Sequence, residues 1–184
     1  VFIDTPGHAA FSNMRKRGGN LADIAILVID INDGIKPQTE ECISILKKYK
    51  TPFVIALNKI DLIQSWRPSK SPFVLNMIAE QSPQVQTAVE TKLYEIVGKC
   101  YDLGFQADRF DRIEDYTKTV AMIPCSAKSS AGIPELLMVL IGLAQKYLEE
   151  KINTDQNAAA KATVLEVKEE QGLGITLDAI VYEG

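Results

Sequence analysis

Continuous apolar runs recur along the chain, and polar residues follow each of them at once. The clearest runs are residues 25–29, 53–57 and 120–124, which are rich in β-branched side chains. A short apolar run without alternation predicts a strand that is buried on both faces, as in a parallel sheet. A further run, residues 1–3, leads into Asp4 and predicts the end of another buried strand.

Helical spacing appears between these runs. In residues 37–50, Ile43, Leu46 and Tyr49 share one face, and the lysines gather at the C-terminal end. Thr39 is the expected N-terminal cap of this helix. Longer helices are predicted at residues 84–103 and 133–148. Strands that alternate with helices in this way predict an α/β fold, in which helices flank a parallel sheet.

Other stretches are less regular. Residues 7–20 predict a mobile loop with a short helix, because Gly18-Gly19 interrupts the helical spacing. Residues 64–118 predict a helical insertion outside the sheet. Near the C-terminus, residues 162–167 and 175–182 alternate apolar and polar side chains around a glycine-rich turn, which predicts an antiparallel hairpin. We therefore expect two domains, residues 1–157 and the beginning of another at 158–184.

Composition narrows the class of protein. The 184 residues are 46% hydrophobic and 24% charged, with a net charge of −4, which is ordinary for a globular protein and gives no general affinity for nucleic acid. Arg15-Lys16-Arg17 is a local candidate for contact with RNA, although a solvated helix face explains it equally well. No secretory or membrane-spanning pattern occurs, so a cytoplasmic location is expected. The three widely spaced cysteines predict reduced and mostly buried thiols.

Candidate chemistry begins directly after the first apolar run, in Asp4-Thr5-Pro6-Gly7-His8. Ligands of open α/β sheets bind at the carboxyl ends of the strands. A carboxylate at Asp4 is placed to hold Mg²⁺ through water, and the N–H of Gly7 can approach a γ-phosphate closely because no side chain intervenes. His8 would then face that phosphate, where it could orient an attacking water.

Two later motifs follow apolar runs in the same way. In Asn58-Lys59-Ile60-Asp61, the carboxylate of Asp61 can accept hydrogen bonds from guanine N1–H and the 2-amino group, which adenine cannot offer. Asn58 would bind the N7 side of the base and tie neighbouring loops together. Ser126-Ala127-Lys128 would present a backbone N–H to guanine O6. The stems of Lys59 and Lys128 would cover the two faces of the base. Together the motifs predict a guanine-nucleotide site for GTP or GDP with Mg²⁺.

These motifs resemble those of the translational GTPases, and the Asp-x-x-Gly-His form is typical of factors that act on the ribosome. Residues 11–18, 29–39 and 165–174 resemble the family of translation initiation factor 5B and bacterial initiation factor 2, and the insertion after Asp61 has an archaeal character. The resemblance covers the whole chain. It implies a monomeric GTPase that joins the two ribosomal subunits, contacts ribosomal RNA, and reaches initiator tRNA through domains further along. Residues 161–184 would begin a β-barrel.

One family motif does not occur in this sequence: there is no Gly-x-x-x-x-Gly-Lys-Ser/Thr. Both ends of the chain fall beside apolar runs, which we interpret as the ends of a fragment. We therefore expect that the 184-residue chain alone has marginal stability and does not hydrolyse GTP. Two alternatives stay open at this point. The chain could be a non-catalytic module that contacts the ribosome or a partner, or it could come from another translational GTPase, such as an elongation factor.

Overall fold

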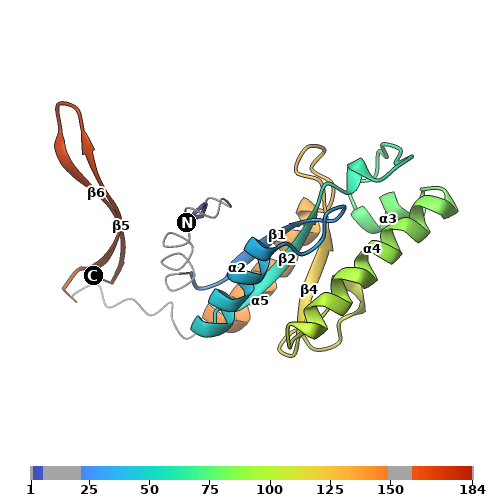
Figure 1. The fold of residues 1–184 in the computed structure, drawn as a ribbon, viewed down its shortest axis with the longest axis horizontal. Coiled ribbons are helices and arrows are strands. Elements are labelled where there is room, and N and C mark those ends of the chain that lie inside the picture. Colours follow the sequence, from blue (N-terminus) through green and yellow to red (C-terminus); the bar gives the residue numbers. More distant parts are fainter. Residues whose placement is uncertain (1, 6–21, 149–158, 184) are drawn as a thin grey trace.

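The computed structural model describes residues 2–5, 22–148 and 159–183 (Figure 1). Element labels follow Figure 1. The strands of the main sheet are β1 (Ala25–Asp30), β2 (Phe53–Asn58), β3 (Gln106–Arg109) and β4 (Thr119–Pro124). The helices are α2 (Pro37–Tyr49), α3 (Val74–Ala79), α4 (Pro83–Asp102) and α5 (Ile133–Leu148), with 3-10 turns η2 (Ile60–Leu62) and η3 (Phe110–Arg112). None of the helices described is long and apolar enough to cross a membrane.

The main sheet is parallel throughout, in the order β1-β2-β4-β3. Strand β1 runs alongside β2 from the pair Ala25 and Phe53 to the pair Asp30 and Asn58, and α2 makes the connection between them. The strands predicted at residues 25–29, 53–57 and 120–124 and the helix that connects the first two are therefore confirmed. The expected burial on both faces is wrong for β1, which lies at the edge of the described sheet, so that Val28 is 60% exposed. Because the strands are parallel, all their carboxyl ends lie at one edge of the sheet.

The core lies where apolar strand residues meet the flanking helices. Val54, Ile55, Leu57, Met122 and Ile123 are wholly inaccessible to solvent. This burial on both faces explains why β2 and β4 have continuous apolar sequences rather than alternating ones. Helix α4 buries its predicted apolar stripe and contacts β3.

The structure corrects three further predictions. Residues 2–5 form no strand and Phe2 is 83% exposed, because four residues gain no ladder hydrogen bonds without a neighbouring strand to pair with. The 64–118 region is more than a helical insertion, since β3 joins the sheet beside β4. Thr39 is not the cap of α2: Lys36 holds the cap position, and Thr39 Oγ1 accepts the N–H of Lys36 at 3.4 Å.

Charged side chains secure the inserted segment to the sheet. Arg109, at the end of β3, forms ion pairs with Glu90 of α4 and with Asp111 of η3, both at 2.6 Å. Arg112 reaches the same Glu90 carboxylate at 2.7 Å. The hydrogen bond with Asp111 raises the pKa of Arg109 further, although burial opposes that shift. Glu90, Arg109 and Asp111 line one side of a hollow beside α3, and none of Asn58, Asp61 and Ser126 lines it.

The predicted hairpin is confirmed as an antiparallel pair, β5 (Lys161–Glu170) and β6 (Gly174–Glu183). Several large apolar side chains on it are exposed, among them Val167 at 61% and Ile175 at 76%. The division into domains at residues 157 and 158 falls outside the described residues and stays a prediction. So does the expected loop and short helix at residues 7–20.

Candidate functional site

Two of the three predicted motifs meet at the carboxyl edge of the sheet. Asn58 is the last residue of β2, and Cys125 and Ser126 directly follow β4, the neighbouring strand. The backbones are joined there, because Cys125 N–H donates to Leu57 O at 2.8 Å and Ile60 N–H donates to Cys125 O at 3.1 Å. Residues far apart in sequence thus form one continuous structure.

Asn58 forms the centre of this edge. Its Oδ1 accepts the N–H of Lys59 at 2.8 Å and the N–H of Ala127 at 2.9 Å. The tie between neighbouring loops that the sequence predicted for Asn58 is therefore present. Both bonds use the oxygen, which leaves the amide nitrogen of Asn58 as a donor for an acceptor such as N7 of a purine.

A sharp change in backbone direction after Asn58 determines the positions of Lys59 and Asp61. Lys59 has φ 66° and ψ 33°, a left-handed conformation that is uncommon for a lysine. The turn places Asp61 in the first turn of η2, half-buried, whereas the preceding Ile60 is fully buried in the core. The apolar anchor and the turn together hold the Asp61 carboxylate at the strand ends rather than inside the sheet.

The Ser126–Lys128 segment is held by its own local bonds. Ser126 is fully buried, its N–H donates to Ala131 O at 2.9 Å, and its Oγ accepts the N–H of Ser129 at 3.2 Å. Lys128 is exposed. Since Asn58 already takes the N–H of Ala127, a base carbonyl at this loop would compete for that donor or use the N–H of Lys128. The sequence did not predict this competition.

The structure describes only part of the Asp4–His8 motif. Asp4 is exposed and belongs to no strand, and Gly7 and His8 lie outside the described residues. Their convergence with the other two motifs stays a prediction. Among the described residues, no group of three or more His, Cys, Asp or Glu side chains could hold a metal ion. Mg²⁺ in nucleotide sites is commonly held by one or two carboxylates, waters and the phosphates themselves, so Asp4 fits such a role only together with a nucleotide.

Two residues at this edge were missed from the sequence. Asp30 and Asn32, at and after the end of β1, bond to Lys59: Asp30 Oδ2 lies 2.8 Å from Lys59 Nζ, and Asn32 Nδ2 lies 3.2 Å from Lys59 O. Neither residue was among the candidate site residues, although both lie in the 29–39 segment that resembles the initiation factor family. The available signal was that Asp30 ends an apolar run in the same way as Asn58 does.

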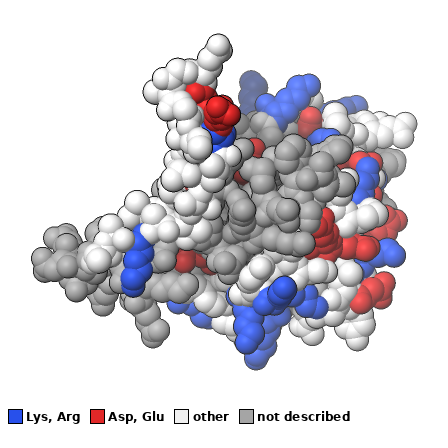
Figure 2. Space-filling model, turned by 60° about the vertical axis from the view of Figure 1, so that its left-hand side comes forward, with Lys and Arg blue, Asp and Glu red and all other residues white. Residues whose placement is uncertain are grey.

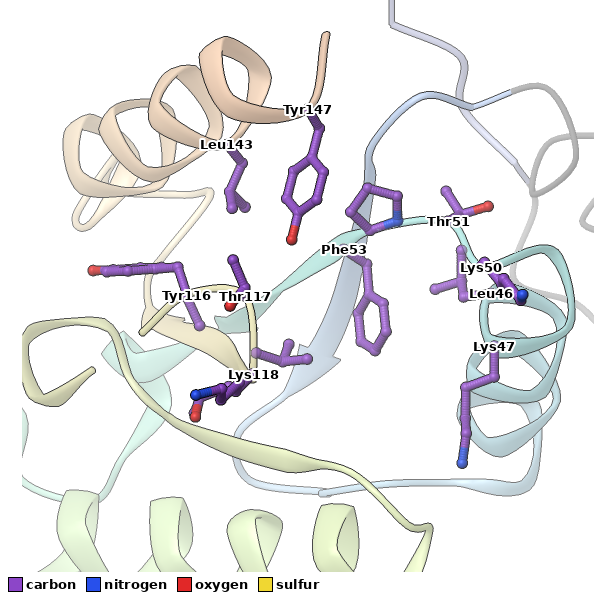
Figure 3. Close-up of a pocket in the computed structure, with 14 residues that line it drawn as sticks. Leu46, Lys47, Lys50, Thr51, Phe53, Tyr116, Thr117, Lys118, Leu143 and Tyr147 are labelled. Carbon is purple, nitrogen blue, oxygen red and sulfur yellow. The ribbon is translucent and has the colours of Figure 1, made fainter. Parts of the chain in front are cut away.

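A separate hollow of about 310 Å³ lies at the opposite, amino edge of the sheet (Figure 3). It lies between the end of α2, the beginnings of β2 and β4, and Leu143 and Tyr147 of α5. Lys47, on its rim, donates to the carbonyl of Leu103 at 2.8 Å and so contributes to helix packing. None of the candidate site residues lines this hollow, so it is not part of the site at the strand ends.

The distribution of charged side chains does not point to a second binding surface on the face shown in Figure 2. On the face shown in Figure 2, basic and acidic side chains of the described residues are interspersed, without a large patch of one sign. The candidate RNA contact Arg15-Lys16-Arg17 lies outside the described residues. The strand-end edge therefore remains the one place where polar side chains from several motifs converge in the part of the chain that is described.

Comparison with known proteins identifies the class. The family model of the elongation factor Tu GTP-binding domain matches residues 1–146, and the chain belongs to this family. Its curated relatives include archaeal initiation factors: the chain is 55% identical to a probable translation initiation factor IF-2 of Methanopyrus kandleri and 56% identical to that of Thermococcus sibiricus. The alignments cover 100% of this chain but 31% of each relative.

Solved structures agree with this placement. GDP-bound aIF5B from Aeropyrum pernix superimposes with a TM-score of 0.89 at 50% identity, over 100% of this chain and 30% of that one. The elongation factor SelB from Methanococcus maripaludis matches with a TM-score of 0.61 at 20% identity, which supports the fold alone. The resemblance to the initiation factor 5B and 2 family, and the α/β fold expected from it, are confirmed.

Proposed function

We propose that the edge formed by β1, β2 and β4 is the base-binding part of a guanine-nucleotide site in a translation initiation GTPase. The observation that carries the proposal is the bond from Asn58 Oδ1 to Ala127 N–H at 2.9 Å. It brings Asp61 and the Ser126–Lys128 loop to one edge, although they lie far apart in sequence. The family and the GDP-bound relative support the same chemistry.

The arrangement suits guanine in particular. Asp61 supplies two acceptor oxygens for N1–H and the 2-amino group, and the amide nitrogen of Asn58 supplies a donor for N7. The loop at Ala127 and Lys128 supplies a backbone N–H for O6. Lys59 and Lys128 bring aliphatic stems that can cover the faces of the base, as lysine stems do on other apolar surfaces. An adenine base would leave the carboxylate unpaired, which is costly in a partly buried site.

For the phosphate side, the proposal assigns Asp4 to Mg²⁺ through water, Gly7 to the γ-phosphate, and His8 to the attacking water. The protein that contains this chain would hydrolyse GTP on the ribosome, promote subunit joining, and act with initiator tRNA in the cytoplasm. Support for these roles comes from the archaeal initiation factors to which the chain is similar. Residues 1–157 would form most of the GTPase domain, and 158–184 the beginning of a β-barrel.

Base specificity is the direct test of the site. In the full-length gene product, wild type should bind GDP at least about 10²-fold more tightly than ADP or xanthosine diphosphate, since buried polar groups reject a base that leaves them unpaired. Asp61→Asn should reverse the preference towards xanthosine diphosphate, because the amide can donate to the 2-carbonyl of xanthine. A wild-type protein without affinity for any nucleotide would instead support a non-catalytic interaction module.

The role of His8 needs a kinetic test. GTP hydrolysis by the full-length protein is compared for wild type and His8→Ala, with and without ribosomes. Because a positioned group contributes about 10²–10⁴-fold in such steps, we expect kcat on the ribosome to fall by at least about 10²-fold while GDP affinity is unchanged. A variant as active as wild type would refute the role of His8 and leave the base-binding proposal intact.

A further inference from the structure

Lys59 is held at three points by residues of the chain itself. Its N–H donates to Asn58 Oδ1 at 2.8 Å, its carbonyl accepts Asn32 Nδ2 at 3.2 Å, and its ammonium lies 2.8 Å from Asp30 Oδ2. The first two bonds fix the left-handed backbone, and the third fixes the far end of the side chain. The whole aliphatic stem therefore spans a defined path between the ends of β2 and β1.

Asp30 is itself well fixed. Its other oxygen, Oδ1, accepts the N–H of Asn32 at 2.9 Å, and β1 pairs with β2 in register up to Asp30 and Asn58. Its side chain is 20% exposed, against 52% for that of Lys59. Partial burial alone would raise the pKa of Asp30, but the hydrogen bonds from Lys59 and Asn32 lower it overall. The hydrogen bond to Asp30 likewise raises the pKa of Lys59, so both groups stay charged at neutral pH.

We propose that Asp30 is a positioning residue for nucleotide binding, which holds the Lys59 stem in place before the base arrives. This inference rests on the proposed guanine site, in which that stem covers one face of the base. A free lysine side chain loses much rotational freedom when it is ordered on a ligand. Here Asp30 removes that freedom in advance, and preorganisation of this kind increases affinity. Asp30 does not touch the nucleotide and acts only through Lys59.

If the ion pair between Asp30 and Lys59 competed with nucleotide binding, removing the Asp30 charge would change the affinity in the opposite direction. If the Lys59 ammonium had to leave Asp30 in order to bind the nucleotide, the ion pair would compete with the ligand. Removing the Asp30 charge would then strengthen binding. The sign of the change in affinity therefore separates positioning from competition, and no change would mean that the pair is an exposed ion pair without a role in binding.

The chain offers a matched control for the test. Asp33 lies on the same turn, but it pairs with Lys36 at 2.6 Å rather than with Lys59. Asp30→Asn and Asp33→Asn each remove one carboxylate charge with almost no change in shape. In the full-length protein, Asp30→Asn should weaken both GDP and a non-hydrolysable GTP analogue by the same factor, roughly 3- to 30-fold, whereas Asp33→Asn should not. The kcat at saturating GTP should be unchanged for Asp33→Asn.

A double-mutant cycle shows whether Asp30 acts through Lys59. Lys59→Met keeps an unbranched stem but removes the ammonium, so Asp30→Asn should have no further effect on affinity in that background. Additive losses, unchanged affinity or tighter binding would each overturn the role of Asp30. A wild-type protein that does not bind guanine nucleotide would overturn the proposed function and this role with it, so the two failures are distinguishable.

Discussion

The side chain of Asn58 binds the backbone of Ala127 at 2.9 Å, across 69 residues of sequence. The same oxygen accepts the N–H of Lys59 at 2.8 Å. One amide group thus fixes the relative position of the loops after β2 and β4. Because each loop supplies different contacts to the proposed base site, the bond sets the geometry of the site as a whole.

Asn58→Ala should therefore weaken nucleotide binding by more than the loss of one ligand contact. Each hydrogen bond lost contributes about 0.5–1.5 kcal/mol, so two correspond to roughly 1–3 kcal/mol, or about 5- to 150-fold in Kd for GDP. Equilibrium binding with the full-length protein measures this. Asn76→Ala, at an exposed position of α3, should leave the Kd unchanged. Equal affinities for the two variants would show that the tie does not organise the site.

The loop after β4 also depends on Gly132. Its φ is +73°, and an added Cβ would lie 2.1 Å from the carbonyl oxygen of Pro124. Gly34 makes a matched control, because its φ is +72° but a Cβ there would meet nothing within 4 Å. Gly34→Ala should lower the free energy of unfolding by about 1–2 kcal/mol through backbone strain alone. Gly132→Ala should lower it by about 3 kcal/mol or more, because the clash adds to that strain.

Chemical denaturation of both variants, under identical conditions, measures the difference. A similar loss in the two proteins would mean that the Ser126–Ala131 loop can move away from β4 without cost. In that case the backbone bond from Ser126 to Ala131 would not be an essential part of the site.

Features of the fold that depend on local pattern were predictable from sequence. The strands β2 and β4 have continuous apolar runs because both faces are covered, and their shared direction puts Asn58 and Ser126 at one edge. The role proposed for Asp61 comes from the hydrogen-bonding groups of guanine and stays a prediction. None of these inferences needs knowledge of side-chain geometry.

Features that depend on a partner elsewhere in the chain were not predictable. The sequence of β3 is Gln-Ala-Asp-Arg, which has no strand pattern, and it is ordered by pairing with β4 and by the Arg109 ion pairs. Residues 2–5 show the converse, since an apolar run does not form a strand without a neighbour. Asp30 was missed because its role depends on where the Lys59 side chain lies, which no spacing rule predicts.

Glu135 connects α5 with α3 across 61 residues of sequence. It is 6% exposed, and its Oε1 accepts the N–H of the fully buried Val74 at 2.6 Å. Glu135→Ala would leave that N–H without a partner, at a cost of about 1–3 kcal/mol. Hydrogen exchange should show lost protection at the first residues of α3. Glu135→Gln keeps the acceptor oxygen and should retain most of that protection, so equal losses would contradict the role of this bond.

The three cysteines give a prediction about reactivity and pH. None of the three forms a disulfide bond, and Cys100 and Cys125 are buried whereas Cys42 is half-buried, which agrees with the prediction of mostly buried thiols. Burial raises the pKa of Cys100 to about 12 and that of Cys125 to about 11. Since thiolates are the reactive form, iodoacetamide at pH 8 should label Cys42 and spare the other two until the protein is unfolded in denaturant.

The raised pKa values of Cys100 and Cys125 make the free energy of unfolding fall as the pH rises. A thiol whose pKa is raised in the folded protein releases its proton more easily in the unfolded chain, where the ordinary value is 9.0. The stability from Cys100 and Cys125 is thus fully present below pH 9 and lost as pH rises towards 11 and 12. Cys100→Ala should flatten that part of the profile of unfolding free energy against pH, whereas Cys42→Ala should not. Rapid labelling of Cys100 in the folded protein at pH 8 would contradict both expectations.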